Sequence, residues 1–115
     1  MKFNKVFYFV TKDYKAFNLL PFNREVDKAH VAKLVESMKK HGFKGVVQII
    51  KTKFIDGTMR YYIVDGQHRI AAAKHLGIEI SFELTELNSK LETAEFIAEL
   101  NTSAKSWGTA NFLAV

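Results

Sequence analysis

Apolar and polar positions in the first part of the chain predict two short strands and a helix. Residues 6–10 (VFYFV) form a run of β-branched and aromatic side chains, which is typical of a buried strand. Residues 16–20 end before the only proline and are expected to form a second short extended segment. Apolar positions then recur at helical spacing between Asp27, a suitable N-cap, and Gly42, a residue type that often follows a helix. A helix is therefore predicted between these two residues.

The middle of the chain predicts a β-hairpin followed by a second helix. Residues 45–51 (GVVQIIK) and 60–64 (RYYIV) have the composition of strands, and residues 56–57 (DG) between them are a strong turn signal. A helix is expected over residues 67–76, and it ends at Gly77. The two adjacent tyrosines of the second strand must point to opposite faces of a sheet, so at most one of them can stack on a ligand.

Beyond this helix the pattern predicts one more strand and one more helix. Residues 79–84 alternate as a strand does, and residues 89–92 (SKLE) form a capping box that opens a helix. Residues 1–100 are therefore expected to fold as one α+β domain, a small mixed sheet packed by helices. Residues 101–115 are expected to begin a C-terminal helical extension, through which copies of the chain associate.

Composition adds a preference for anionic partners. The 115 residues include 17 Lys and Arg against 12 Asp and Glu, a formal charge of +5, which favours nucleic acids, nucleotides or acidic proteins. The absence of cysteine excludes a disulfide scaffold, a Cys-ligated zinc site and a thiol nucleophile. Ten phenylalanines predict a core dominated by aromatic rings. No signal peptide and no membrane span are recognised, so a cytoplasmic protein without a membrane partner is expected.

Candidate chemistry concentrates at residues 65–69 (DGQHR), where the second hairpin strand turns into a helix. Gly66 lets the backbone approach a ligand closely, and either Asp65 or Gly66 can cap the helix. The first N–H groups of a helix point out of its N-terminus, where the dipole favours an anion. His68 and Arg69 add side-chain donors, and the planar fork of Arg69 suits phosphate. The alternative is a plain structural turn with Arg69 as a surface cation. A cation in the first turn of a helix is, however, unfavourable by about 1 kcal/mol or less, because it opposes the helix dipole.

Histidine-based metal binding is not expected. His68 and His75 lie seven residues apart on the predicted helix, about 10 Å along its axis, which is too far for one shared ion. His30 and His41 flank the first helix and are interpreted as ordinary surface residues.

The sequence "YYIVDGQHRIAAAKHLG" resembles the signature of the ParB/sulfiredoxin-like superfamily, which carries a Gly-x-His-Arg or Gly-Glu-Arg-Arg turn at this strand-to-helix junction. The segment "LPFNREVDKAHVAKLVESMKKHGFKGVVQI" is similar to the opening of that superfamily, so the resemblance covers residues 18–87. It implies the ParB/sulfiredoxin-like fold. In sulfiredoxins the reactive thiol precedes the His-Arg pair, whereas Gln67 stands there in this chain, so the protein is not a true sulfiredoxin.

The resemblance also implies a nucleotide site. In ParB-like proteins this turn binds the triphosphate of a nucleotide, so phosphate contacts are expected from Gly66, Gln67, His68 and Arg69. The strand after the first helix also lines the nucleotide, which implicates Gly45 and Gln48, and a later helix end of the family aligns with Asn101.

The expected function is a nucleotide-binding domain that acts as a switch or in phosphotransfer. CTP or ATP with Mg²⁺ is the expected cofactor, in a DNA-related system such as DNA partitioning in a bacterium, plasmid or phage. Asp65, His68 and Glu36 are the candidate catalytic residues, and Asp65 or Glu36 is the candidate ligand for Mg²⁺ carried by the nucleotide. The alternatives are a non-enzymatic DNA-binding or protein-interaction module and a ParB-like nuclease.

Overall fold

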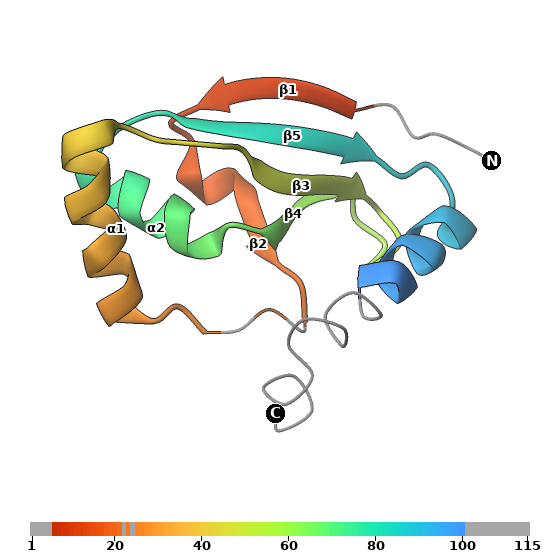
Figure 1. The fold of residues 1–115 in the computed structure, drawn as a ribbon. Helices are drawn as coiled ribbons and strands as arrows, with labels where there is room; N and C mark the ends of the chain where they lie inside the picture. Colours follow the sequence, from red (N-terminus) through yellow and green to blue (C-terminus); the bar gives the residue numbers. More distant parts are fainter. Residues whose placement is uncertain (1–5, 22, 24, 101–115) are drawn as a thin grey trace.

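A computed structural model describes residues 6–21, 23 and 25–100 of the chain and shows one mixed five-stranded sheet with the order β1-β5-β3-β4-β2 (Figure 1). The strands are β1 (Val6–Thr11), β2 (Phe17–Leu19), β3 (Val47–Thr52), β4 (Arg60–Asp65) and β5 (Ile80–Glu86). The helices are α1 (Lys28–His41), α2 (Gln67–Leu76), a helix over residues 90–100 and a short 3-10 helix, Tyr14–Ala16. The predicted α+β class and the order of elements are confirmed.

Local capping explains where two of the helices begin. The Asp27 carboxylate accepts the N–H groups of Ala29 and His30 at 2.9 and 3.3 Å, which starts α1 at the predicted residue. Before the helix over residues 90–100, the Ser89 hydroxyl accepts the N–H of Glu92 at 3.0 Å. Both N-caps were predicted from residue type and spacing, and both are confirmed.

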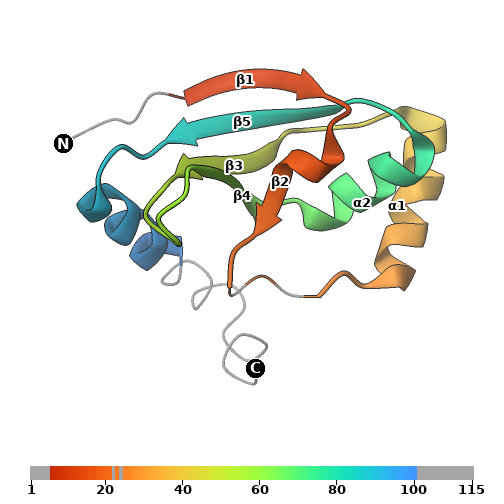
Figure 2. The same cartoon turned by 180° about the vertical axis from the view of Figure 1, so that it is seen from behind.

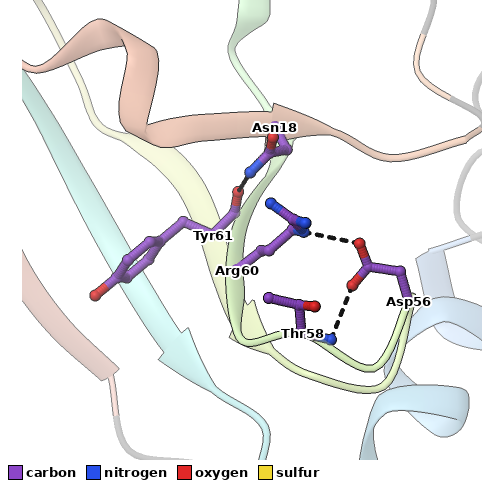
Figure 3. A network of polar contacts seen from close by, with 5 residues as sticks. All are labelled: Asn18, Asp56, Thr58, Arg60 and Tyr61. Carbon is purple, nitrogen blue, oxygen red and sulfur yellow. Dashed lines mark hydrogen bonds and ion pairs between the residues drawn. The ribbon is translucent and has the colours of Figure 1, made fainter.

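The β3–β4 hairpin is closed by a polar network around Asp56 (Figure 3). Its carboxylate accepts Thr58 N–H at 3.1 Å and Arg60 Nε at 2.7 Å. The hydrogen bond from Arg60, and to a smaller extent that from Thr58, holds the pKa of the Asp56 carboxyl below its ordinary value. The Asn18 side chain of β2 donates to the Tyr61 carbonyl at 3.2 Å, next to the parallel pairing of β2 with β4. The predicted turn therefore lies next to the place where the short strand β2 pairs with β4.

The sheet separates two apolar clusters. The larger one lies under α1 and α2 and includes Val47, Ile49, Ile63 and Phe82. The smaller one lies on the other face, where residues 90–100 cover the sheet next to the hairpin (Figures 1 and 2). Its buried members are Leu20, Ile50, Tyr62 and Leu87. Tyr61 packs against the first cluster and Tyr62 belongs to the second, so these neighbours point to opposite faces as expected.

The prediction that residues 6–10 form a buried strand is wrong. They form a strand, but β1 lies at the edge of the sheet, and the five side chains are between 39% and 69% exposed. The prediction of an aromatic core is also wrong for the described residues, because Phe82 is their only buried phenylalanine. Aliphatic side chains from the inner strands fill the core instead. Among the described residues, no helix is long and apolar enough to cross a membrane.

Candidate functional site

The turn between β4 and α2 is built around Gly66. This residue has a φ of 109° and is the N-cap of α2, without a side-chain capping bond. Asp65 is the last residue of β4 and is exposed, so of the two candidate caps the structure selects Gly66. The first hydrogen bond inside α2 runs from Ile70 N–H to the Gly66 carbonyl at 3.0 Å, and the earlier N–H groups point out of the N-terminal end of the helix.

Close packing, as well as backbone conformation, requires glycine at position 66. A Cβ atom there would lie 3.0 and 3.1 Å from the two methyl carbons of Val47 and 3.3 Å from Nη2 of Arg69. A positive φ is also strained for any residue with a side chain. The backbone at this turn is therefore held close to β3 and to the Arg69 guanidinium, and it forms a small cradle that a side chain would fill.

Arg69 fastens the α1–β3 loop to the first turn of α2. Its Nη2 donates to the Val46 carbonyl at 3.0 Å and its Nη1 to the Lys44 carbonyl at 3.3 Å. Gly45, between these two residues, has a φ of 77°, and a Cβ atom on it would lie 2.9 Å from Nη1 of Arg69. These carbonyl oxygens offset the unfavourable position of a cation at a helix N-terminus, so the helix dipole alone does not demand a bound anion. Two of the five guanidinium N–H donors make these bonds.

His68 connects the beginnings of the two helices. Its Nε2 accepts the backbone N–H of Asp27, the N-cap of α1, at 3.0 Å. The ring also makes an edge contact with the ring of His30, with centroids 4.7 Å apart. An accepting Nε2 places the proton of the neutral imidazole on Nδ1. His30 was interpreted as an ordinary surface residue, and its position against His68 is a contact that the sequence did not reveal.

An open pocket of about 280 Å³ lies beside Arg69, between α1 and the loop that follows it. Its lining combines apolar side chains with polar and basic ones, and consists of Leu34, Ser37, Met38, His41, Gly42, Lys44 and Arg69. From the sequence, His41 was expected to be an ordinary surface residue and Gly42 to follow the first helix. The sequence signal of a tight loop in this place was the pair of glycines at positions 42 and 45, and both have a positive φ in the structure.

Two candidate residues lie apart from this pocket. Gln48 is exposed and pairs with Asp65 across β3 and β4, next to a register shift between Gln48 and Ile49, and it does not line the pocket. Glu36 is exposed on α1, bound to Lys39 at 3.2 Å, and lies about half a helical turn away from the pocket-lining Met38.

The remaining candidates are placed as follows. Asp65 directly precedes the cradle, and Gly45, Gly66 and Arg69 come together as described above. Asn101 lies outside the described residues. Within the described part of the chain, no group of three or more His, Asp or Glu residues is arranged to hold a metal ion.

The sequence model of the ParB N-terminal domain family matches residues 16–108, which is most of the chain and contains the whole turn. The chain belongs to the ParB N-terminal domain family. Among curated proteins, none matches its sequence.

Solved structures show the same fold as this ParB N-terminal domain. The C-terminally truncated chromosome-partitioning protein ParB from Caulobacter crescentus, complexed with CTP-gamma-S, superposes with a TM-score of 0.61 at 17% identity over 89% of this chain. A Pnob8-like ParB-N domain gives a TM-score of 0.60 at 16% identity, also over 89% of this chain. This chain spans about half of the first structure, 53%, and 38% of the second.

Sulfiredoxin from Arabidopsis thaliana shares the fold more distantly. It gives a TM-score of 0.50 at 21% identity, covering 80% of this chain and 94% of its own. This chain has no cysteine, so it lacks the thiol that the resemblance to sulfiredoxins would require at Gln67. The expected membership of the ParB/sulfiredoxin-like superfamily is confirmed, on the ParB side.

Proposed function

We propose that this domain binds a ribonucleoside triphosphate, CTP or ATP, with the phosphates at the turn formed by Gly66, Gln67, His68 and Arg69. The single observation that carries the proposal is the glycine cradle at the N-terminus of α2, in which Gly66 packs against Val47 and Arg69. Membership of the ParB N-terminal domain family supports it, as does the likeness to a ParB that was solved with CTP-gamma-S.

The turn offers three kinds of attraction to a phosphate group. The backbone at Gly66 leaves space for close approach, the N-terminal end of α2 favours negative charge, and Arg69 brings a guanidinium to the same place. The first turn of α2 contains no acidic residue that would compete with a bound anion. A phosphate bound here interacts with a guanidinium that the carbonyls of Lys44 and Val46 already orient.

The nucleoside part of the ligand belongs, in this proposal, in the pocket beside Arg69. Its volume of about 280 Å³ is near the lower end of small-molecule sites, which suits one base with its sugar. Leu34 and Met38 provide apolar surface for a ring, and Ser37 and His41 provide polar groups at the same wall. Asp65, next to the cradle, is the carboxylate we assign to Mg²⁺ carried by the nucleotide, and Glu36 is left out because it points elsewhere.

A nucleotide-dependent switch in DNA partitioning is the biological role that we infer from the family. This chain spans 53% of the Caulobacter crescentus ParB chain, so the role is proposed for the domain and is not taken over from that whole protein. Plasmid or phage systems are included in the proposal, and so is a role in phosphotransfer.

Isothermal titration calorimetry with CTP, ATP, GTP and UTP in the presence of Mg²⁺ tests the proposal. At least one triphosphate is expected to bind, and the matching nucleoside without phosphates is expected to bind far more weakly. In Gly66→Ala the new methyl group meets Val47 and Arg69, so binding should weaken by about tenfold or more.

The matched control is Gly57→Ala. Gly57 also has a positive φ, 84°, but a Cβ atom there meets nothing within 4 Å, and the residue lies in the β3–β4 loop. Its substitution also places a side chain at a positive φ, and it should leave nucleotide affinity unchanged. The absence of binding by every triphosphate at millimolar concentration would overturn the proposal. Binding of duplex DNA alone, with a steep dependence on salt, would favour the DNA-binding module instead.

A further inference from the structure

The strand β1 forms an open edge of the sheet. It pairs with β5 along its whole length, from Val6 opposite Thr85 to Thr11 opposite Ile80, without a bulge. Both views show β1 as the outermost strand, with no described element along its outer side (Figures 1 and 2). Along such an edge every second residue directs its N–H and C=O away from the sheet, which offers a template for another strand.

The two edges of this sheet differ in how they are protected. The opposite edge, β2, has three residues, follows a 3-10 helix and is followed closely by Pro21, and these features limit strand addition. By contrast, β1 has six residues and contains no charged residue, proline or glycine. Its apolar side chains are also exposed, with Tyr8 at 69% and Val10 at 60%. The β1 edge therefore has the features of a strand that is covered by another strand.

The sequence of β1 favours a second copy of the same strand as its partner. Residues 6–10 read VFYFV, which is a palindrome centred on Tyr8. In an antiparallel pair centred on this residue, Val6 lies opposite Val10 of the other copy, and Phe7 lies opposite Phe9. Each pair consists of side chains that point to the same face of the joined sheet. An unrelated strand has no reason to match this symmetry.

We propose that two copies of this protein associate through their β1 strands, antiparallel and centred on Tyr8, and so form one continuous ten-stranded sheet. Within one copy, the ring of Phe9 already packs on Phe82 at 5.5 Å and lies 6.2 Å from Phe7. Across the two-fold axis the same row of rings continues into the second copy. On the other face, Val6, Tyr8 and Val10 meet their counterparts with no like charges opposed.

The size of this surface indicates a reversible dimer. Burial of the whole exposed area of these five side chains on both copies would remove at most about 1,000 Å², which is below the size of stable interfaces and typical of weak ones. Association should therefore depend on concentration in the micromolar to millimolar range. This interface lies in the folded domain, whereas the interface expected from the sequence lies in the C-terminal extension. Dimerisation through β1 needs no nucleotide, so a failure to dimerise would not count against the proposed nucleotide binding.

Sedimentation equilibrium on double variants at positions 6 and 10 tests both the surface and the register. In Val6→Lys/Val10→Glu each lysine faces a glutamate of the other copy, twice per dimer, so the dimer should persist. In Val6→Lys/Val10→Lys and Val6→Glu/Val10→Glu like charges face each other, and dimerisation should weaken by roughly tenfold or more. Circular dichroism establishes that all three variants are folded. The side chains are 45% and 60% exposed, which favours folded variants.

Disulfide trapping gives an independent measure, because the natural chain has no cysteine. Tyr8→Cys places two thiols opposite each other at the two-fold axis, and should yield a covalent dimer under mild oxidation. Leu91→Cys is the matched control, since Leu91 is equally exposed at 69% but lies on the helix over residues 90–100. It should remain largely monomeric at the same concentration.

Three outcomes would overturn the proposal. The first is a wild-type protein that stays monomeric up to millimolar concentration, as expected if the edge serves a foreign strand. The second is a dimer that the two like-charge variants leave intact, since it would use another surface. The third is equal covalent dimer from Tyr8→Cys and Leu91→Cys.

Discussion

At the scale of single residues, two glycines in the α1–β3 loop have nearly the same φ and different surroundings. Gly42 and Gly45 have φ values of 74° and 77°, but only at Gly45 does a Cβ atom reach Arg69, at 2.9 Å from Nη1. Both Ala substitutions therefore place a side chain at a positive φ. Gly45→Ala additionally displaces the guanidinium, the end of a flexible side chain, from its carbonyl partners. We expect Gly45→Ala to lower the free energy of unfolding by about 1 kcal/mol more than Gly42→Ala.

Urea denaturation of the two glycine variants measures this difference. Gly45→Ala should also weaken nucleotide binding, because it moves the guanidinium of Arg69. Equal stability of the two variants would contradict the contact between Gly45 and Arg69.

The hydrogen bonds of Arg69 are a second prediction at this scale. Lysine keeps the charge but cannot span the Lys44 and Val46 carbonyls with a planar fork. Arg69→Lys should therefore reduce the free energy of unfolding by about 1–2 kcal/mol in urea denaturation. Arg60→Lys is the control, since Arg60 makes an exposed ion pair with Asp56 that contributes little. Equal effects of the two substitutions would show that Arg69 does not fasten the loop.

The pH dependence of stability follows from Asp56. Its pKa is lowered in the folded protein, chiefly by the hydrogen bond from Arg60 and then by that from Thr58. A lowered folded-state pKa means that the unfolded chain binds the proton more tightly. The contribution is therefore present above about pH 4 and is lost as the pH falls through the folded-state pKa.

The comparison with Asp56→Asn measures that contribution. The wild-type protein should melt slightly higher than the variant at neutral pH, and the two melting temperatures should converge in acid. The difference should be small because the side chain is 44% exposed. A difference in melting temperature that grows on acidification would contradict the assigned ionisation.

At the scale of elements, a buried pair of hydroxyls joins β3 to the helix over residues 90–100. Thr52 Oγ1 and Thr93 Oγ1 lie 2.9 Å apart, and Thr93 also donates to the Ser89 carbonyl at 3.0 Å. The two threonines are 0% and 3% exposed. Thr93→Val keeps the shape and removes these bonds, so the free energy of unfolding should fall by about 1–2 kcal/mol.

A double-mutant cycle with Thr52→Val separates this bond from other effects. If the hydroxyls interact, the loss in the double variant should be smaller than the sum of the two single losses. Strict additivity of the two substitutions in chemical denaturation would show that the hydroxyl pair does not stabilise the packing of this helix.

Periodicity and capping were sufficient to predict the elements, but not their places in the sheet. Asp27, Gly77 and Ser89 act through local geometry, and the helices begin or end where these residue types predicted. The VFYFV pattern predicted a strand correctly and its burial wrongly, because burial depends on strand order. Because β5 lies between β1 and β3, β1 is at the edge of the sheet, and the residues of β1 alone do not reveal this strand order.

In the candidate site, too, residues that are neighbours in the sequence were predicted, and contacts between distant positions were not. Gly66 and Arg69 were found because the turn is continuous in sequence. The bond from Asp27 to His68 spans 41 positions and that from Arg69 to Lys44 spans 25, so neither follows from a local pattern. Gln48 was assigned to the site by resemblance; in the structure it pairs with Asp65 across β3 and β4 and is not part of the pocket lining.

At the scale of the whole molecule, the sheet keeps the two proposed binding surfaces apart. The glycine cradle lies at the end of β4, and β5 and β3 separate that strand from β1. A dimer through β1 would therefore add strands at one edge of the sheet and leave the pocket beside Arg69 unchanged. Nucleotide binding and self-association should accordingly be lost independently, in Gly66→Ala and in Val6→Lys/Val10→Lys respectively.

An NMR titration of ¹⁵N-labelled protein with CTP and with ATP, each with Mg²⁺, tests most directly whether the turn at residues 66–69 binds a triphosphate. For at least one of them, the largest shifts are expected for the amide resonances of Gly66, Gln67, His68 and Arg69, and Gly45 should follow because it contacts Arg69. The matching nucleoside without phosphates should not shift them, and Gly57 should stay in place. Triphosphate binding that leaves the amides of the turn unchanged, or no binding at all, would contradict the claim.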